Sequence, residues 1–262
     1  DTDYPIYYDF SGNHLRDFPD LMKSLQLITA PLVTLNFEFC DLDEDTLIGL
    51  FKSIRKNDSL WGLQELLIAG NPLTARAINS LSNLIRKLDK HRYHALNTIS
   101  FGPTLDLESA LLIFSDPQRK LRHLRIYNTV ISLDSIYDLC RLLRSSDKLN
   151  NFELIDCSIQ DEELDKLLNS IIQNQNCNEI GLNFSGMKMS DARFGLLIKT
   201  IREGLGNKLI SLVLDRTKFT LAHLNQLLTV FDSLPHLSYL SLNGNFNQQQ
   251  GMAESLVKLT EI

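Results

Sequence analysis

Apolar residues recur along this chain in an eleven-residue pattern, L-x-x-L-x-L-x-x-N-x-L, which is followed each time by a segment of different periodicity. The pattern is clearest in LQELLIAGNPL, which places Leu63, Leu66, Ile68, Asn71 and Leu73 on its five fixed positions. Further copies begin at residues 5, 32, 96, 121, 149, 177, 209 and 237, and successive starts lie 29 residues apart on average. The copy from residue 96 is the weakest, because Asp106 stands at its last apolar position. The short spacing of apolar residues inside each copy predicts a β-strand.

The second half of each unit predicts a helix, because its apolar residues recur at i, i+3, i+4 and i+7. Such sets begin at Leu47, Ile136, Leu164, Phe194 and Leu224. One strand and one helix cannot bury their apolar faces alone, whereas stacked copies share a continuous core. The sequence therefore predicts an α/β solenoid of about nine repeats, a horseshoe or arc with a concave parallel sheet and convex helices. The prediction treats residues 1–262 as a single domain.

The motifs FSGN (10–13), LIAGNPL (67–73) and LNGN (242–245), with the helices that follow them, resemble the ribonuclease-inhibitor-like leucine-rich-repeat family. The resemblance covers essentially the whole chain and is specific for the fold. It implies a protein that works by binding other proteins inside cells, as ribonuclease inhibitor, tropomodulin and the capping-protein regulators do. The irregular repeat spacing, from 25 to 33 residues, is more similar to the tropomodulin and capping-protein-regulator branch. Bacterial effectors imitate the same design.

Composition adds mainly exclusions. A formal net charge of -6 does not favour nucleic-acid binding, and no apolar stretch is long enough for a membrane span. The four cysteines are too far apart for a disulfide framework, which favours a cytoplasmic location. We interpret Cys40 and Cys157 as turn residues in the asparagine position, Cys140 as helix core and Cys177 as filling a leucine position, rather than as reactive thiols.

No metal, cofactor or enzymatic activity is predicted. His91 and His94 are close in sequence, but no second ligand pair accompanies them at zinc-site spacing. The chain contains no Gly-rich phosphate loop, HExxH or GxSxG motif in a suitable setting.

The repeat pattern also predicts which side chains leave the core. Residues at the third and fifth positions stand on the exposed strand face, and those at the seventh and eighth positions lie at its edge. Acidic residues outnumber basic ones at these positions by seven (Asp9, Glu38, Glu65, Glu153, Asp156, Glu179, Asp215) to two (Arg125, Arg216). The candidate partner-binding residues are Tyr7, Phe39, Glu65, Leu67, Arg125, Tyr127, Glu153, Ile155, Asp156, Glu179, Phe184, Asp215 and Tyr239.

Large apolar anchors among polar residues are typical of protein interfaces, so we expect a scaffold that binds a partner protein, one with basic character, on the concave face. Strand preference for aromatic residues and an ordinary solvated face are the simpler interpretation of the same residues. Two other functions stay open. One is a GTPase-activating or cytoskeleton-regulatory protein, and the other is a structural spacer in a larger protein.

The two ends of the pattern predict that the solenoid is part of a longer protein. The first copy starts at Pro5, with no upstream helix to cover Tyr8 and Phe10. At the other end, Met252, Leu256 and Leu259 form a helix face with no polar cap after it. The alternative is that Tyr4, Ile6 and the last helix are themselves modest caps.

Overall fold

The computed structural model of the chain describes residues 6–16, 19–29, 32–90, 96–114 and 121–246. They belong to two compact units, Asp1–Val130 and Ile131–Ile262. Several expectations lie outside the described residues: the start of the first copy at Pro5, the contribution of Tyr4, the pair His91 and His94, and the final helix face of Met252, Leu256 and Leu259.

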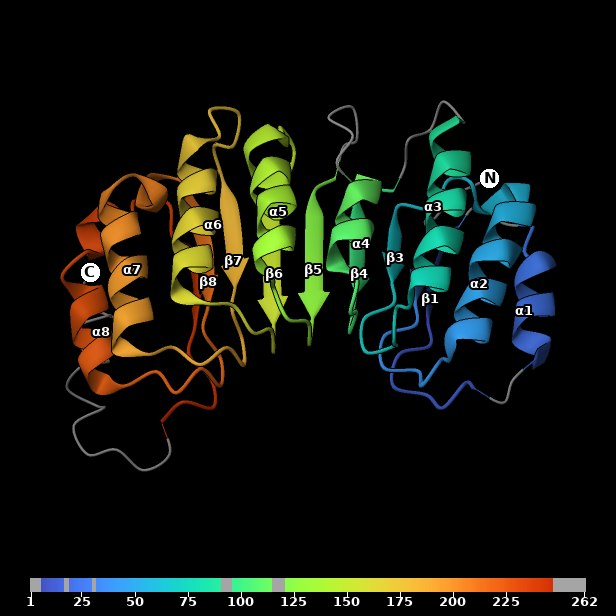
Figure 1. Cartoon of the computed structure of the whole chain (residues 1–262), viewed down its shortest axis with the longest axis horizontal. Coiled ribbons are helices and arrows are strands. Elements are labelled where there is room, and N and C mark those ends of the chain that lie inside the picture. Colours follow the sequence, from blue (N-terminus) through green and yellow to red (C-terminus); the bar gives the residue numbers. More distant parts are fainter. Residues whose placement is uncertain (1–5, 17–18, 30–31, 91–95, 115–120, 247–262) are drawn as a thin grey trace. The chain divides into compact units, whose positions relative to one another are not determined.

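Strands and helices alternate in the first unit, and all of its strands pair in parallel with the next strand along the chain. Figure 1 shows the helices in front of these strands. The strands are β1 (Ile6–Asp9), β2 (Leu32–Asn36), β3 (Glu65–Leu67), β4 (Thr98–Phe101) and β5 (His123–Tyr127). The helices are α1 (Pro19–Gln26), α2 (Glu44–Lys56), α3 (Ala75–Lys90) and α4 (Leu107–Phe114), with a 3-10 turn at Asp58–Leu60.

The second unit repeats this arrangement, and β6, β7, β8 and β9 also pair in parallel in chain order. Its strands are β6 (Asn151–Ile155), β7 (Ile180–Asn183), β8 (Leu209–Val213) and β9 (Tyr239–Ser241). Its helices are α5 (Leu133–Ser145), α6 (Asp161–Gln173), α7 (Asp191–Arg202) and α8 (Leu221–Leu228), with 3-10 turns at Leu205–Asn207 and Phe231–Ser233. The predicted alternation of strand and helix around a parallel sheet is therefore confirmed.

The core of each unit lies between the strands and the helices. Inward strand residues such as Leu35 and Leu66 are fully buried, and so are the predicted helical positions Leu47 and Leu164. Because parallel strands need a crossover connection, a helix after every strand covers the same face of the sheet each time. No helix in the described part of the chain combines the length and apolarity needed to cross a membrane.

The side chain at the asparagine position of the repeat forms hydrogen bonds with turn backbone. Asn71 is 1% exposed; its amide donates to the carbonyls of Phe37 and Ile68 at 2.7 and 3.0 Å, and its oxygen accepts from the N–H of Leu42. Where the pattern carries cysteine, the Cys40 thiol donates to the carbonyl of Phe10 instead. A side chain at this position thus satisfies turn backbone that would otherwise be buried without partners.

The turn after the strand fixes the register of the repeats. The eighth position adopts a left-handed conformation, with φ between 44° and 80°, at Gly12, Phe39, Gly70, Asn128, Asp156, Gly186, Arg216 and Gly244. Strand pairing gives the same register: Gly181 of β7 pairs with Asn151 and Ser211, which hold the third position in the sixth and eighth copies.

The predicted start of the seventh copy is therefore wrong. Its pattern begins two residues later than Cys177, because Gly181 and not Glu179 holds the third position. The position of the following helix supports the later start. In the sixth copy, the helical set begins at Leu164, 15 residues after the start at 149; Phe194 lies 15 residues after Glu179 but 17 after Cys177. Cys177 is still buried, but Ile180 pairs with Leu209, the first leucine position of the next copy, because the register shifts by one residue between Ile180 and Gly181.

Truncation of an inward residue should destabilise the fold strongly. Leu154 and Leu212 are both 0% exposed, so we expect Leu154→Ala and Leu212→Ala each to lower the free energy of unfolding by about 2–5 kcal/mol. Urea denaturation of the purified chain measures this. Val130→Ala, at a side chain that is 68% exposed, is the control and should change stability by less than about 0.5 kcal/mol. Losses below about 1 kcal/mol at both leucines would contradict the assigned positions.

Candidate functional site

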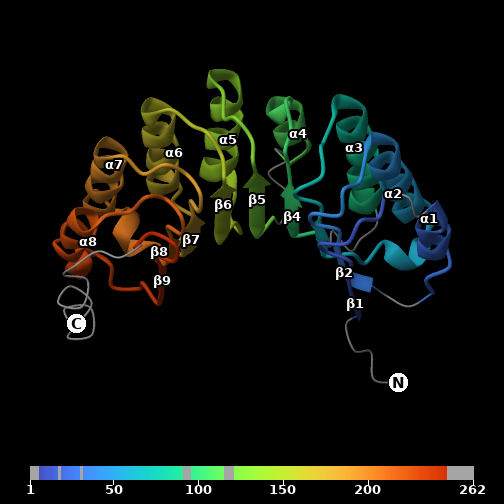
Figure 2. The same cartoon turned by 90° about the horizontal axis from the view of Figure 1, so that it is seen from below.

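The face of each sheet opposite the helices, here called the open sheet face, carries most of the candidate residues. Figure 2 shows the helices of each unit on one side of the strands and leaves the other side open. On this face Tyr7 of β1 is 60% exposed, and Tyr239 of β9 is 56% exposed. The open sheet face therefore presents aromatic side chains to solvent in both units.

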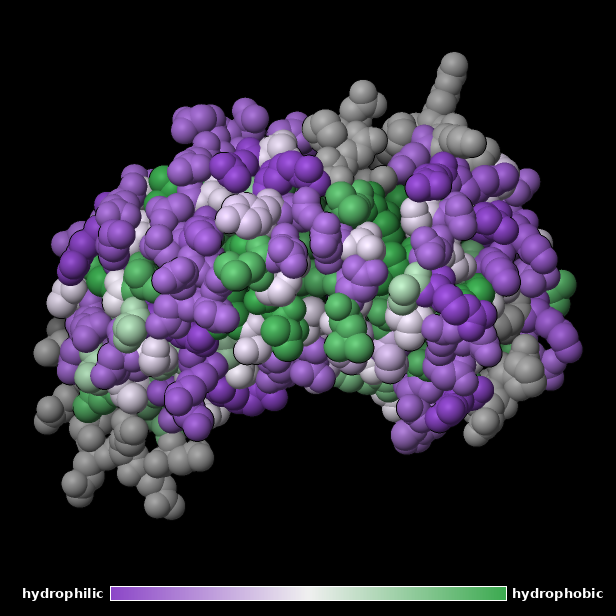
Figure 3. Space-filling view, in the orientation of Figure 1, coloured by the Kyte–Doolittle hydropathy of each residue, from purple (hydrophilic) through white to green (hydrophobic). Residues whose placement is uncertain are grey.

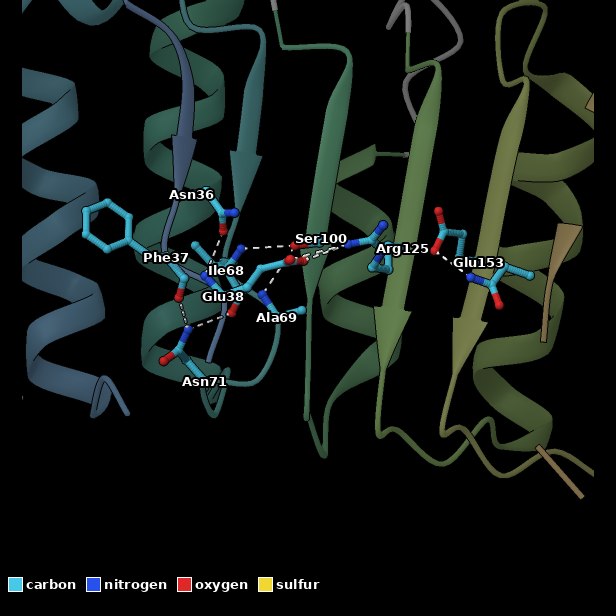
Figure 4. Close-up of polar contacts among 10 residues, drawn as sticks. Asn36, Phe37, Glu38, Ile68, Ala69, Asn71, Ser100, Arg125 and Glu153 are labelled. Carbon is cyan, nitrogen blue, oxygen red and sulfur yellow. Dashed lines mark hydrogen bonds and ion pairs between the residues drawn. The ribbon is translucent and has the colours of Figure 1, made fainter. Parts of the chain in front are cut away.

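An ion pair crosses the open sheet face of the first unit. The Arg125 guanidinium, on β5, donates to the two carboxylate oxygens of Glu38 at 3.0 and 3.3 Å. Glu38 lies two residues after the end of β2, so the contact with β5 passes over the two intervening strands, β3 and β4 (Figure 4). Small side chains, Ala69 and Ser100, occupy that interval. Both charged side chains are largely buried, with 12% of Glu38 and 28% of Arg125 exposed.

An aromatic contact runs parallel to this ion pair. The rings of Phe39 and Tyr127 lie edge to face, with centroids 5.0 Å apart. Phe39 is 50% exposed and Tyr127 is half-buried. The structure thus brings three candidate residues, Phe39, Arg125 and Tyr127, into one cluster with Glu38. We call these four residues the bridging cluster.

Side chains at the left-handed turn position lean onto the next repeat. A Cβ atom added to Gly70 would lie 2.4 Å from Cδ1 of Phe39, and one added to Gly186 would meet the carboxylate of Asp156. Arg216 contacts Gly244 in the same way. At these three turns, a side chain that leans onto the next repeat is met there by glycine.

Polar contacts organise the open sheet face of the second unit. Arg216 lies 3.6 Å from the Asp156 carboxylate, and the Asn183 amide donates to Glu153 at 3.1 Å. Asp215 accepts from the Ser241 hydroxyl and the Asn243 N–H, both at 2.7 Å. These contacts hold the carboxylates in fixed positions on the face.

Three further candidates occupy their predicted places as half-buried residues. Glu65 on β3 accepts a hydrogen bond from the Thr34 hydroxyl at 2.7 Å, Leu67 ends the same strand, and Ile155 ends β6.

Two candidates are not on the open sheet face. Phe184 is only 1% exposed, because the two-residue change of register turns it into the core. Glu179 is exposed but precedes β7. The predicted place on the open sheet face was therefore wrong for both residues. Asn183 holds the outward fifth position that sequence reasoning missed.

The acidic excess on the face is smaller than predicted. Without Glu179, the open sheet faces carry six carboxylates and two arginines. Each arginine contacts a different carboxylate: Arg125 contacts Glu38, and Arg216 contacts Asp156. Asp9 on β1 stays ionised readily, because hydrogen bonds from the hydroxyl and N–H of Ser11 hold the pKa of its carboxyl below the usual value. A net negative charge remains on the face of each unit.

The cysteines have the character of core residues. All four are buried free thiols. Burial raises the pKa of the Cys40, Cys140 and Cys177 thiols, which disfavours the nucleophilic thiolate. Among the described residues, no group of three or more His, Cys, Asp or Glu side chains is arranged to hold a metal ion.

The helical faces carry grooves between neighbouring helices. In the first unit Ile78, Ile85 and Leu112 line one between α3 and α4. In the second unit Tyr137, Cys140 and Lys166 line another between α5 and α6. Figure 3 shows a helical face that is mainly hydrophilic, with hydrophobic residues visible between the helices. Neither groove gathers a catalytic set of side chains.

A search of protein-family models found none that matches this chain.

The contact between Phe39 and Gly70 can be tested by stability. Gly70→Ala places a Cβ against the Phe39 ring at a φ of +80°, so we expect a loss of about 1–3 kcal/mol in the free energy of unfolding. Adding Phe39→Ala should recover part of that loss. Gly195→Ala, where the new Cβ meets nothing and lies in helix α7, is the control and should stabilise by up to about 1 kcal/mol. An equal loss with and without Phe39 would show that the two residues do not interact.

Proposed function

We propose that this chain is a leucine-rich-repeat protein of the ribonuclease-inhibitor type that binds a partner protein through its open sheet faces. The bridging cluster is the main support for this proposal. It combines a half-exposed aromatic pair with a partly buried ion pair, and interface hot spots commonly consist of such residues.

Within the bridging cluster, the backbone conformation of Phe39 is the strongest single observation. Its φ is +56°, in a region where a bulky residue is strained, and Gly12 and Gly70 hold the same position in the neighbouring repeats. Strained residues in folded proteins cluster at functional sites. Folding alone would favour glycine here, so we infer that an exposed phenylalanine serves binding.

The face selects a partner by charge as well as by apolar contact. Tyr7 and Tyr239 offer large exposed rings, and the carboxylates outnumber the arginines. A basic partner surface with apolar side chains complements this arrangement. We further propose that the protein is cytoplasmic, because its four cysteines are free thiols.

Site-directed photo-crosslinking locates the binding face. Tyr7, Tyr239 and Tyr137 are similarly exposed, at 60%, 56% and 63%, but Tyr137 lies on helix α5. Each is replaced in turn by p-benzoylphenylalanine, and the protein is irradiated in the cells that express it. We expect discrete adducts from positions 7 or 239 and none from position 137. Adducts from position 137 alone would place the interface on the helices and contradict the proposal.

Phe39→Gly separates binding from folding. Relief of the turn strain, about 1–3 kcal/mol, opposes the lost contact with Tyr127, about 0.5–1.5 kcal/mol. Thermal denaturation should therefore show at most a small loss of stability, whereas the crosslinked adduct from position 7 should fall at least tenfold. Unchanged adduct formation by a folded Phe39→Gly variant would remove Phe39 from the interface.

A further inference from the structure

The edge of the first unit where strands end and helices begin carries an apolar stripe. Pro72, Leu105 and Val130 lie in the three consecutive loops that follow β3, β4 and β5. Leu105 is fully exposed, Val130 is 68% exposed and Pro72 is exposed as well. We call these residues the rim stripe, and Figure 1 shows its loops below the ends of the strands.

Packing does not account for the rim stripe. In the β4–α4 loop the core is filled by Thr104 and Leu107, both buried, while Leu105 between them points to solvent. In the β3–α3 loop the buried residue is Leu73, next to exposed Pro72. Single exposed apolar residues are ordinary, but an apolar row over three adjacent loops is typical of a binding surface.

Carboxylates surround the rim stripe. Apart from Glu38 of the bridging cluster, the described loops and first helical turns along this edge contain seven of them, Asp20, Asp41, Asp43, Glu44, Asp45, Asp106 and Glu108, against two arginines, Arg16 and Arg76. Arg16 lies 3.5 Å from Asp43, and Arg76 contacts Glu44 and Asp45. The edge therefore keeps a net negative charge after its arginines are paired.

Helix capping explains only part of this charge. Asp43 accepts the N–H of Thr46, and Asp106 accepts that of Ser109, so both cap a helix. In contrast, Asp41 and Asp45 are 64% and 85% exposed, and Glu108 is exposed. Exposed carboxylates beside exposed apolar groups complement a segment that carries both lysine or arginine and apolar side chains.

We propose that the rim stripe is a second docking surface, separate from the open sheet face, and that its occupant is a basic amphipathic segment of a partner protein. Apolar side chains of the segment contact Leu105 and Val130. Its cations lie against the surrounding carboxylates. The proposal does not depend on what binds the open sheet face.

A pair of synthetic peptides tests the proposal. One is a 14-residue amphipathic peptide of leucine and lysine, and the other has glutamate in place of every lysine. Fluorescence anisotropy with the whole chain should show binding of the lysine peptide, weakened by added salt, and at least tenfold weaker binding of the glutamate peptide. Equal binding of both peptides would overturn the charge argument.

Variants assign the binding to the rim stripe. Leu105→Ser with Val130→Thr should weaken binding of the lysine peptide at least tenfold without changing the melting temperature, because both side chains are exposed. Leu27→Ser is the matched control, since Leu27 is 78% exposed but lies just after α1. Unchanged affinity in the double variant would overturn the proposal.

Two further outcomes would also count against it. Loss of peptide binding in Phe39→Gly would place the peptide on the open sheet face, whereas retention there separates this proposal from the proposed function. The second outcome concerns self-association, measured by light scattering. If the wild-type chain self-associates and the Leu105→Ser, Val130→Thr variant does not, the occupant of the rim stripe is a second copy of the chain.

Discussion

The left-handed turn that ends each strand is the constraint on which the remaining structure depends. It reverses the chain after a fixed number of strand residues, so the backbone N–H of the turn residue reaches the next repeat. Gly70 donates to the carbonyl of Gly102 at 2.7 Å, and Arg216 donates to that of Asn243 at 2.8 Å. The hydrogen-bonded ladder therefore extends beyond the strands and holds each helix over the same face of the sheet. A repeat that ended its strand elsewhere would lose these bonds and expose its apolar side chains.

The same turn determines what the open sheet face can carry. A side chain at the turn position leans over the following repeat, which is why Phe39 precedes Gly70 and Asp156 precedes Gly186. Large side chains are thus spaced apart, and the small residues between them leave room for contacts across several strands. Glu38 reaches Arg125 only because Ala69 and Ser100 lie below the path. The bridging cluster follows from where the sequence allows bulk and where it requires glycine.

The rim stripe and the open sheet face differ in their relation to stability. Phe39 is half-exposed but contacts Tyr127, so its substitution removes a contact of the fold. Leu105 is fully exposed and contributes little to the core. Residues of the second kind can change with little cost in stability, which makes the rim stripe the simpler surface on which to test the proposed binding independently of folding.

The sequence by itself determined the period, the alternation of strand and helix, the inward leucines and the recurring asparagine position. These depend on local patterns that each repeat carries in full. The sequence did not determine the register of the seventh copy, because a shift of two residues keeps the alternation of inward and outward side chains. One signal was present: FSG at 184–186 repeats FSG at 10–12 and would have aligned Gly186 with Gly12. Only the tertiary structure decided that Glu38 meets Arg125 and Phe39 meets Tyr127. Each pair joins residues that are almost ninety positions apart in sequence, and no local pattern encodes how far a side chain reaches across the intervening strands.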